Sequence, residues 1–333
     1  MTKVLITGAT GFLGRHVVRE ALASGLAVRV GTRRPDRNLP GDVERVPFDL
    51  EDPKTVDEAV SGVQAVFHLA GLVSRRPKDA AVMHRIHVSG TRRLLEAMFN
   101  SRVRRIVLAS SSGTVACSAK PTKPMHEDHP ADLETIARWP YYLSKLYQEQ
   151  EVLRWQTQGD IEAVILNPSL LLGPGDERLS STEDVLDVLH GRYPIAVDGT
   201  VAFVDVRDVA PMFPKALRSE RTGVRYLLNG ANMSVRRFAE RIALAGGVSP
   251  PKLVVSAKWA LGAAKWADGL ASTLGIDASF DPVSVDMAGH HWSVDCTRAR
   301  HVFEFSPRDP SVTIRDTVQD LIGRKLFRSK VHR

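Results

Sequence analysis

Short apolar runs alternate with amphipathic stretches through the first half of the chain. The runs are four to eight residues long and nearly continuous, which predicts strands that are buried on both faces of a sheet. The stretches between them have apolar residues at helical spacing. Strands are expected at residues 3–6, 26–32, 65–71, 105–111 and 162–169, and helices at 12–25, 55–63, 87–101 and 140–159. This order predicts an α/β fold of the Rossmann type, a doubly wound parallel sheet with helices on both faces.

The alternation weakens after residue 176. A strand that leads into a helix is expected over 199–210, one more strand over 225–230, and mainly helices over 231–323. We therefore predict two domains. An NADP-binding Rossmann domain covers residues 1–172, its sheet completed by segments near 200–230, and a smaller, mainly helical substrate-binding lobe covers residues 173–333.

Composition excludes several classes of protein. The formal net charge is +7, but the basic residues are scattered apart from the tail at 324–333, which does not favour nucleic-acid binding. Cys117 and Cys296 lie far apart, so neither a disulfide framework nor a zinc site is expected, and a reducing compartment fits. No apolar run reaches about 18 residues without a charge, and no signal-peptide pattern is visible. We expect a cytoplasmic protein with no membrane span and no bound metal.

Three glycines stand at every third position directly after the first apolar run. Gly8 would permit a tight turn, Gly11 would let a pyrophosphate approach the backbone, and Gly14 would let helix pack on strand. The N-terminus of the following helix offers free N–H groups and a partial positive charge to phosphates. The turn therefore predicts a dinucleotide site, the alternative being glycines that serve packing alone. The expected contacts are Gly8, Thr10, Gly11, Phe12, Leu13 and Gly14.

The end of the second predicted strand favours NADP over NAD. An acidic residue that would hold the ribose hydroxyls of NAD is missing there, and Arg33 and Arg34 follow instead. A guanidinium can hold a 2′-phosphate through paired hydrogen bonds, whereas a carboxylate would repel it. We predict NADP as the cofactor, with NAD possible. The alternative is that the arginines form a solvated loop and that Asp36 binds the ribose.

An ordered set of motifs resembles the extended short-chain dehydrogenase/reductase superfamily over roughly residues 3–325. The motifs are TGATGFLG (7–14), FDL (48–50), HLAG (68–71), HVSGT (87–91), ASSSGTV (109–115), YYLSK (141–145), NPSLLLGPGD (167–176) and FVDVRDVA (203–210). Within this superfamily, which includes proteins similar to NAD-dependent epimerases and dehydratases, the chain looks most like the branch of dihydroflavonol reductases and 3β-hydroxysteroid dehydrogenases.

The resemblance implies further cofactor contacts. Asp49 and Leu50 would contact the adenine, and His87 stands where the family usually has asparagine, a departure expected to alter the bonding between helix and strand. By the same resemblance, Leu69, Ala70 and Gly71 would line the cofactor at the third strand, and Pro168, Ser169 and Leu170 would lie near the nicotinamide.

Tyr141 and Lys145 are four residues apart on a predicted helix and so share a face. A free phenol has a pKa near 10 and is a poor acid–base catalyst at neutral pH. A nearby ammonium, together with the positive charge of the cofactor, is expected to lower that pKa, and the same lysine can hold the ribose hydroxyls. The resemblance implies that a serine at the end of the fourth strand bonds the substrate oxygen. That serine is Ser111, with Ser112 as the alternative.

Other polar and aromatic clusters are interpreted as structural. His290 and His291 lack a third ligand at metal spacing, and Asp205 and Asp208 suit capping and hydrogen bonding. Surface ion pairing is expected of Arg178, Arg192 and Arg207, with an anionic substrate as the alternative. Trp259 and Trp266 share a helical face, which predicts packing between lobes or an apolar wall over the substrate.

Three functions fit these motifs. The first is an NADP-dependent oxidoreductase that transfers a hydride between the nicotinamide and a ketone, an aldehyde or an alcohol. The second is a nucleotide-sugar epimerase with tightly bound NAD, and the third is a non-enzymatic regulator that senses the cofactor. The missing acid at the second strand disfavours the epimerase, and the retained Tyr–Lys pair disfavours the regulator. We expect a small-molecule substrate, a carbonyl or alcohol compound, no nucleic-acid partner, and a homodimer by resemblance.

Overall fold

The computed structural model describes residues 1–33, 39–193, 195–274 and 282–328, without the side chains of residues 265 and 267–274. Its centre is a seven-stranded parallel sheet with the order β10-β6-β5-β4-β1-β2-β3. These strands are β1 (Lys3–Thr7), β2 (Ala27–Thr32), β3 (Glu44–Pro47), β4 (Ala65–His68), β5 (Arg105–Ala109), β6 (Glu162–Pro168) and β10 (Val224–Leu228). The predicted α/β fold of the Rossmann type is confirmed.

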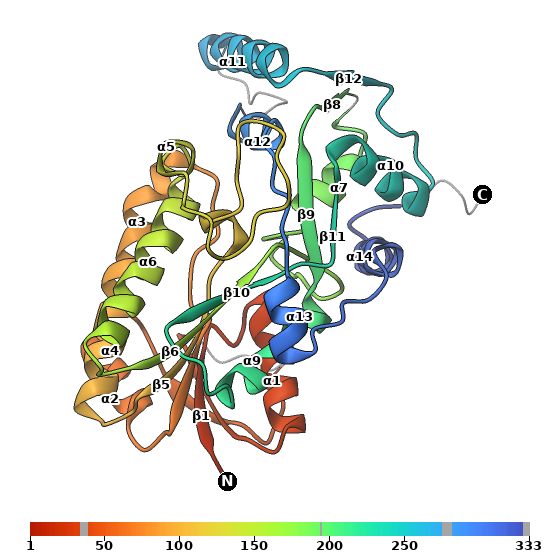
Figure 1. Cartoon of the computed structure of the whole chain (residues 1–333). Helices are drawn as coiled ribbons and strands as arrows, with labels where there is room; N and C mark the ends of the chain where they lie inside the picture. The colour runs from red at the N-terminus through yellow and green to blue at the C-terminus, as the bar shows by residue number, and fades with distance from the viewer. Residues whose placement is uncertain (34–38, 194, 275–281, 329–333) are drawn as a thin grey trace.

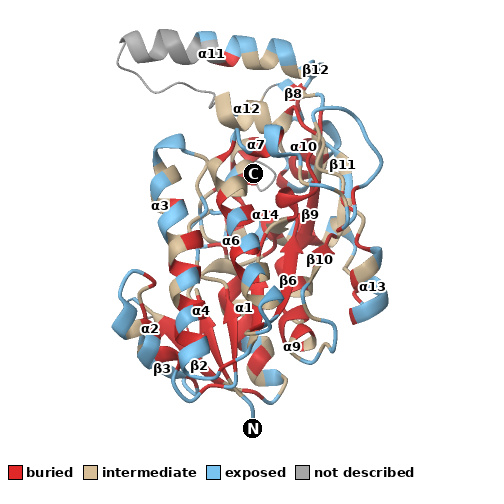
Figure 2. Cartoon of the chain, turned by 60° about the vertical axis from the view of Figure 1, so that its left-hand side comes forward, coloured by how far each residue is buried: buried red, intermediate tan, exposed pale blue. Residues whose placement is uncertain are grey.

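Side chains of successive strand residues point to opposite faces of the sheet, and each face carries its own core. In β1, Val4 and Ile6 pack into one cluster, whereas Leu5 packs into the other. The first cluster is covered by α1 (Phe12–Ala23), α9 (Met212–Leu217) and α13 (Thr297–Phe303), and the second by α2 (Pro53–Val60), α4 (Gly90–Asn100) and α6 (Pro140–Thr157). Figure 1 shows these helices on the two sides of the sheet, and Figure 2 shows its strands as the most continuously buried part of the chain.

A second group of elements lies at the end of the molecule away from the N-terminus (Figure 1). A three-stranded sheet has the order β11-β9-β7, and a two-stranded sheet pairs β12 with β8. The strands are β7 (Leu170–Leu172), β8 (Ile195–Val197), β9 (Thr200–Asp205), β11 (Ala231–Ser234) and β12 (Leu253–Val255). The helices are α7 (Glu183–Leu189), α10 (Val235–Gly246), α11 (Ala257–Leu274), α12 (Pro282–Ala288) and α14 (Pro310–Gly323).

Several predicted elements differ from the structure in detail. β3 was not expected, because its four residues, ERVP, form no apolar run. The segment 231–323 contains β11 and β12 as well as helices, since strands of three or four residues give too little periodicity to detect. The helix expected at 87–101 is α4 preceded by a π-helical turn at Arg85–Ser89. No helix in the described part of the chain is long and apolar enough to cross a membrane.

Candidate active site

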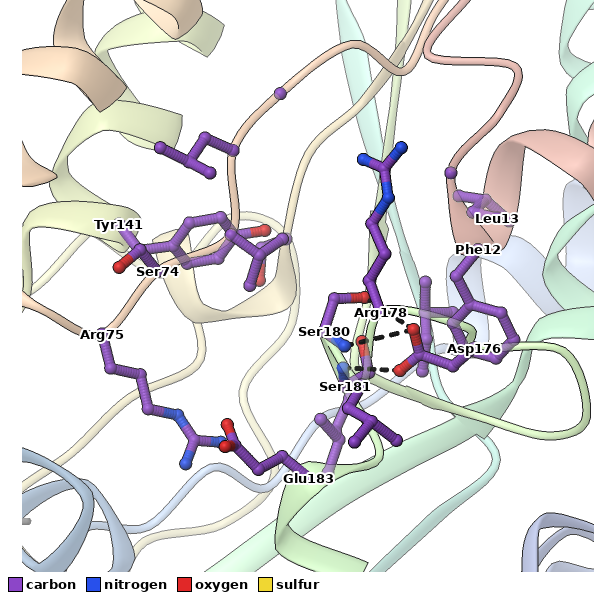
Figure 3. A pocket seen from close by; sticks show the side chains of 18 of the residues that line it. Phe12, Leu13, Ser74, Arg75, Tyr141, Asp176, Arg178, Ser180, Ser181 and Glu183 are labelled. Carbon is purple, nitrogen blue, oxygen red and sulfur yellow. Dashed lines mark hydrogen bonds between the residues drawn. The ribbon is translucent and has the colours of Figure 1, made fainter. Parts of the chain in front are cut away.

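The carboxyl ends of β1, β4, β5 and β6 open into a cavity of about 1340 Å³, the place where open parallel sheets bind ligands. Most of the residues predicted to contact a cofactor or substrate line this cavity. They are Gly8, Thr10, Gly11, Phe12, Leu13, Gly14, Leu69, Gly71, Ser111, Tyr141, Lys145, Pro168, Ser169 and Leu170. Figure 3 shows Tyr141 on one wall and Phe12 and Leu13 on the opposite wall.

The glycine turn has two kinds of glycine. Gly8 has a φ of 68°, and a Cβ there would lie 2.6 Å from the carbonyl carbon of Leu69. A Cβ at Gly14 would lie 2.2 Å from the carbonyl oxygen of Gly8. These two glycines are therefore required by backbone packing alone.

Gly11 serves the cavity rather than the core. A Cβ there would meet only the Gly8 oxygen, at 3.2 Å, so the remaining space around it is open. Gly11 is also the N-cap of α1, and it gives the helix no side-chain hydrogen bond. The N–H groups of the first turn consequently have no capping side chain, and they face a cavity into which a phosphate fits. The residues present thus fit a bound dinucleotide.

The described residues predicted to bind the adenine end of the cofactor lie outside the lining of the cavity. Arg33 directly follows β2 and is exposed, whereas Arg34 and Asp36 lie outside the described residues. Asp49 accepts a hydrogen bond from the N–H of Glu51, and Leu50 is buried in the sheet core. Neither of these two residues lines the cavity, and nor does Ala70, which packs against the same core.

Tyr141 and Lys145 both project from the first turns of α6 into the cavity. The Nζ atom of Lys145 donates hydrogen bonds to the carbonyl oxygen of Ala109, at 2.7 Å, and to Oε1 of Gln148. Burial lowers the pKa of Lys145 to about 8, and the nearby Glu149 carboxylate opposes this shift.

The pKa of Tyr141 is shifted in the direction opposite to the expectation from the sequence. Burial raises it to about 12, because the phenolate would lose its hydration. Lys145 does not offset this effect, since its ammonium is directed to Ala109 and Gln148. Tyr141 is therefore a neutral phenol at pH 7 and can donate a proton.

The three serines after β5 differ in their partners. Ser110 donates to Glu149 and is buried. The Oγ atom of Ser111 accepts a hydrogen bond from the N–H of Gly113 at 3.3 Å, at the start of a short 3₁₀ turn. Ser112 is buried within that turn, and both Ser111 and Ser112 line the cavity. The choice between these two serines stays open.

His87, the first residue of the HVSGT motif, has a structural role. Its Nε2 accepts the N–H of Leu72 at 3.0 Å, so Nδ1 carries the proton and donates to Oγ of Ser144 at 2.8 Å. Ser144 in turn donates to the carbonyl oxygen of Tyr141 at 2.7 Å. The His87 ring also meets the Tyr141 ring edge to face, with centroids 6.0 Å apart. His87 thus ties the segment after β4 to the first turn of α6.

Sequence reasoning missed a buried polar chain behind Lys145. Gln148 donates to Oγ1 of Thr91 at 2.8 Å and to Nε2 of His68 at 3.2 Å. The other ring nitrogen of His68 lies 2.8 Å from Oγ1 of Thr7. These residues come from β1, β4, α4 and α6, and all of them are buried. This chain of hydrogen bonds fixes Gln148, which together with the carbonyl oxygen of Ala109 holds the ammonium of Lys145 at the end of β5.

The buried histidines predict that the protein loses stability in acid. Burial lowers the pKa of His68 from 6.5 to about 3 and lowers that of His87 in the same direction. Between pH 6.5 and about pH 3, His68 is protonated in the unfolded chain but neutral in the folded chain. The free energy of unfolding therefore falls as pH falls. Each pKa unit corresponds to about 1.4 kcal/mol, so His68 should remove about 2 kcal/mol of the free energy of unfolding between pH 7 and pH 5.

Urea unfolding at about pH 7 and about pH 5 measures this effect. We expect His68→Asn to be less stable than the natural chain at neutral pH and to lose less free energy of unfolding on acidification. His301→Asn, at an exposed position, is the control and should keep the full acid dependence. An unchanged acid dependence in His68→Asn would contradict the prediction.

The remaining candidates are mostly structural. Asp205 caps α8 (Val206–Val209), and Asp208 pairs with Arg308 at 2.8 Å. The described residues contain no cluster of three or more metal-ligating side chains. The Nδ1 atom of His290 lies 2.7 Å from the carbonyl oxygen of Asp286.

The three arginines expected to form surface ion pairs, with an anionic substrate as the alternative, behave differently from one another. Arg192 pairs with Asp187 at 2.6 Å, and Arg207 pairs with Asp205 and Asp316. Arg178 lines the cavity (Figure 3) and has no ion-pair partner in the described part of the chain.

The predicted packing of Trp259 and Trp266 between lobes is wrong. The two side chains are 81% and 74% exposed, because α11 lies across the outer end of the molecule rather than between two lobes. Both residues line a second cavity next to the first.

Comparisons with known proteins agree with this architecture. The family model described as "NAD dependent epimerase/dehydratase family" matches residues 4–228. Sterol demethylase protein B of Methylococcus capsulatus is 32% identical over 80% of this chain and 81% of its own length. A putative dihydroflavonol 4-reductase of Synechocystis is 31% identical over 88% of this chain and 87% of its own.

Among solved structures, that of gox2253 superposes with a TM-score of 0.84 at 28% identity, covering 98% of this chain and all of the other. The family match spans the glycine turn, the serine turn and the Tyr–Lys helix. This protein belongs to the NAD-dependent epimerase/dehydratase family.

Proposed function

We propose that this chain is an NADP-dependent oxidoreductase that transfers a hydride between the nicotinamide and a ketone, an aldehyde or a secondary alcohol. The observation that carries the proposal is the meeting of three elements in one cavity. The glycine turn after β1, the serines after β5, and Tyr141 with Lys145 on α6 all line it. Similarity to a putative dihydroflavonol 4-reductase supports a reductase within the family.

The proposed cofactor contacts include residues that line the cavity and, at the adenine end, residues outside its lining. The N–H groups of the first turn of α1 would hold the pyrophosphate, and Lys145 would hold the nicotinamide ribose. Arg33 and Arg34 would hold the 2′-phosphate, and Asp49 and Leu50 would contact the adenine. Leu69, Ala70 and Gly71 would line the cofactor, and Pro168, Ser169 and Leu170 would adjoin the nicotinamide. When bound, NADP supplies the hydride donor or acceptor.

Side chains of the protein donate and accept the proton of the reaction. In reduction, Tyr141 donates its phenolic proton to the substrate oxygen as the carbonyl carbon gains the hydride, and in oxidation the proton returns to Tyr141. Ser111, or Ser112 in its place, donates a hydrogen bond to the same oxygen. The phenol of Tyr141 is protonated at pH 7 and so carries the proton that reduction needs, but burial raises its pKa and makes it a weaker acid until positive charge lies near it. Lys145 supplies positive charge when a phenolate forms.

The nucleotide that the purified protein carries tests this function against the epimerase. The protein is denatured and the released nucleotide is identified by mass. Released NADP, or none, together with NADPH oxidation by a ketone, supports the oxidoreductase. Stoichiometric NAD that survives purification, without net oxidation of NADPH, overturns it.

Substitution of Arg33 by aspartate should shift the cofactor preference toward NAD. A guanidinium bond to a phosphate contributes roughly 1.5–3 kcal/mol, so the ratio of kcat/KM for NADP to that for NAD should fall by about ten- to a hundredfold. Arg221→Asp is the matched control, because Arg221 is exposed and is not one of the residues that line the cavity. An unchanged NADP preference in Arg33→Asp would remove this residue from the phosphate site.

A further inference from the structure

A second cavity of about 680 Å³ lies beneath α11, bordered by β8, α10 and α12. Its volume is within the range that binds drug-sized ligands, roughly 300–1,000 Å³. Eight residues line both this cavity and the first one, so the two cavities are contiguous. They are Arg75, Leu170, Asp184, Tyr193, Val201, Ser284, Val285 and Trp292. We call the second cavity the apolar chamber.

Its lining is almost entirely apolar. Phe238 and Ala239 of α10, Ile195 and Val197 of β8, and Met287 of α12 contribute to it. A cavity of this size with such walls gains free energy by taking up apolar surface, about 25 cal/mol per Å² removed from water.

The charged side chains that line the chamber, among the described residues, are Arg75 and Asp184. They pair with each other through two contacts, Nη1 to Oδ1 at 2.6 Å and Nη2 to Oδ2 at 2.5 Å. Arg75 also donates to Oγ of Ser284 at 3.2 Å. Because each of these charges already has a partner, the described lining of the chamber has no spare cation for a diphosphate and no spare anion for an amine.

Aromatic side chains lie between the first cavity, which Tyr141 lines, and the apolar chamber. Trp292 lies 5.1 Å from Tyr142 and 5.2 Å from Trp139, measured between ring centroids. It donates its indole N–H to the carbonyl oxygen of Met287 at 2.9 Å, which leaves its ring for apolar contact. At the outer end, the exposed Trp259 and Trp266 line the chamber from α11.

From this geometry we infer that the apolar chamber binds the water-insoluble body of a lipid-sized ketone or alcohol, whose carbon–oxygen group lies at Tyr141. This inference rests on the proposed function and specifies its substrate class. The body of the ligand extends from Trp292 to the underside of α11, where it covers apolar side chains that otherwise face water. The apolar lining and the internally paired charges disfavour a nucleotide sugar in the chamber.

Binding of a neutral fluorophore tests the chamber without any turnover. N-phenyl-naphthylamine is titrated into the full chain, and saturable fluorescence enhancement is expected. Ala263→Glu places a carboxylate at an exposed position that lines the chamber, and should weaken binding at least tenfold. Gly262→Glu is the matched control on the same helix, because Gly262 is exposed, does not line the chamber and has nothing near its Cβ. Absence of saturable binding, or equal weakening by both variants, overturns the inference.

Methyl ketones from butanone to decanone provide the kinetic test. A buried methylene contributes about 0.8 kcal/mol, so kcat/KM with NADPH should rise three- to fourfold per added carbon. Ala263→Glu should flatten this rise, whereas Gly262→Glu should keep it. A flat series in the natural chain overturns the inference and leaves the oxidoreductase intact. No turnover of any ketone, with the fluorophore still bound, overturns the proposed function and leaves the chamber as a lipid-binding site.

Discussion

Tyr141→Phe should lower kcat/KM for ketone reduction by about a hundred- to ten-thousandfold, the usual contribution of a general acid. The substitution removes one oxygen and leaves the ring, which packs edge to face against His87 with centroids 6.0 Å apart. Because the glycine turn is untouched, the dissociation constant for NADPH should stay within about twofold. Steady-state kinetics and a fluorescence titration with NADPH measure the two quantities.

The neighbouring Tyr142→Phe is the matched control for this experiment. Tyr142 also lines the cavity, and burial raises its pKa as well. It packs against Trp292 and Trp139, so the loss of its hydroxyl should leave kcat within a few-fold of the natural value. If Tyr141→Phe kept most of its rate, or if Tyr142→Phe lost as much, Tyr141 would not be the proton donor.

Lys145→Met should lower kcat by a similar factor and should also weaken cofactor binding. The lysine is buried, and its ammonium donates to the carbonyl oxygen of Ala109 at the end of β5. Methionine keeps the length and apolar character of the side chain, which limits the loss of packing. Gln148 would lose its contact with the ammonium, so the free energy of unfolding is measured alongside the kinetics.

The pH dependence of NADP binding separates charge from packing at Lys145. Burial lowers the pKa of Lys145 to about 8, so the free protein loses this positive charge as pH rises through that value. NADP affinity in the natural chain should therefore fall above about pH 8, and in Lys145→Met it should stay low without that fall. Parallel pH profiles for the two proteins would show that the lysine does not bind the cofactor through its charge.

Local sequence patterns predicted much of the fold. The continuous apolar runs of β1, β4 and β6 mark strands buried on both faces, and the glycine spacing marks the first turn of the sheet. The four-residue spacing of Tyr141 and Lys145 places both side chains at one cavity, since helical periodicity is itself local.

Features that depend on tertiary packing could not be predicted in the same way. The polar chain behind Lys145 joins Thr7, His68, Thr91 and Gln148 from four elements, and no short-range pattern relates them. The pKa of Tyr141 follows from its burial, which one helix does not determine. Trp259 and Trp266 do share a helical face, but periodicity cannot tell whether another element covers that face.

The apolar chamber was also beyond sequence reasoning. Two of its borders, β8 and β12, are three residues long and pair with each other across more than fifty positions of the chain. Its neutrality depends on the pairing of Arg75 with Asp184, which come from different parts of the sequence. The helical face shared by Trp259 and Trp266 predicts an apolar wall as one alternative, and only the arrangement of the elements makes a cavity behind it.

A crystal structure of the chain with NADP tests the central claim most directly. We predict that the pyrophosphate lies on the N–H groups at the start of α1 and that the nicotinamide lies beside Pro168. The phenolic oxygen of Tyr141 should then face the open space in front of the hydride-bearing carbon, where a carbonyl carbon fits at roughly 3–3.5 Å. A pyrophosphate bound elsewhere, or a nicotinamide on the far side of the cavity from Tyr141, would contradict the account.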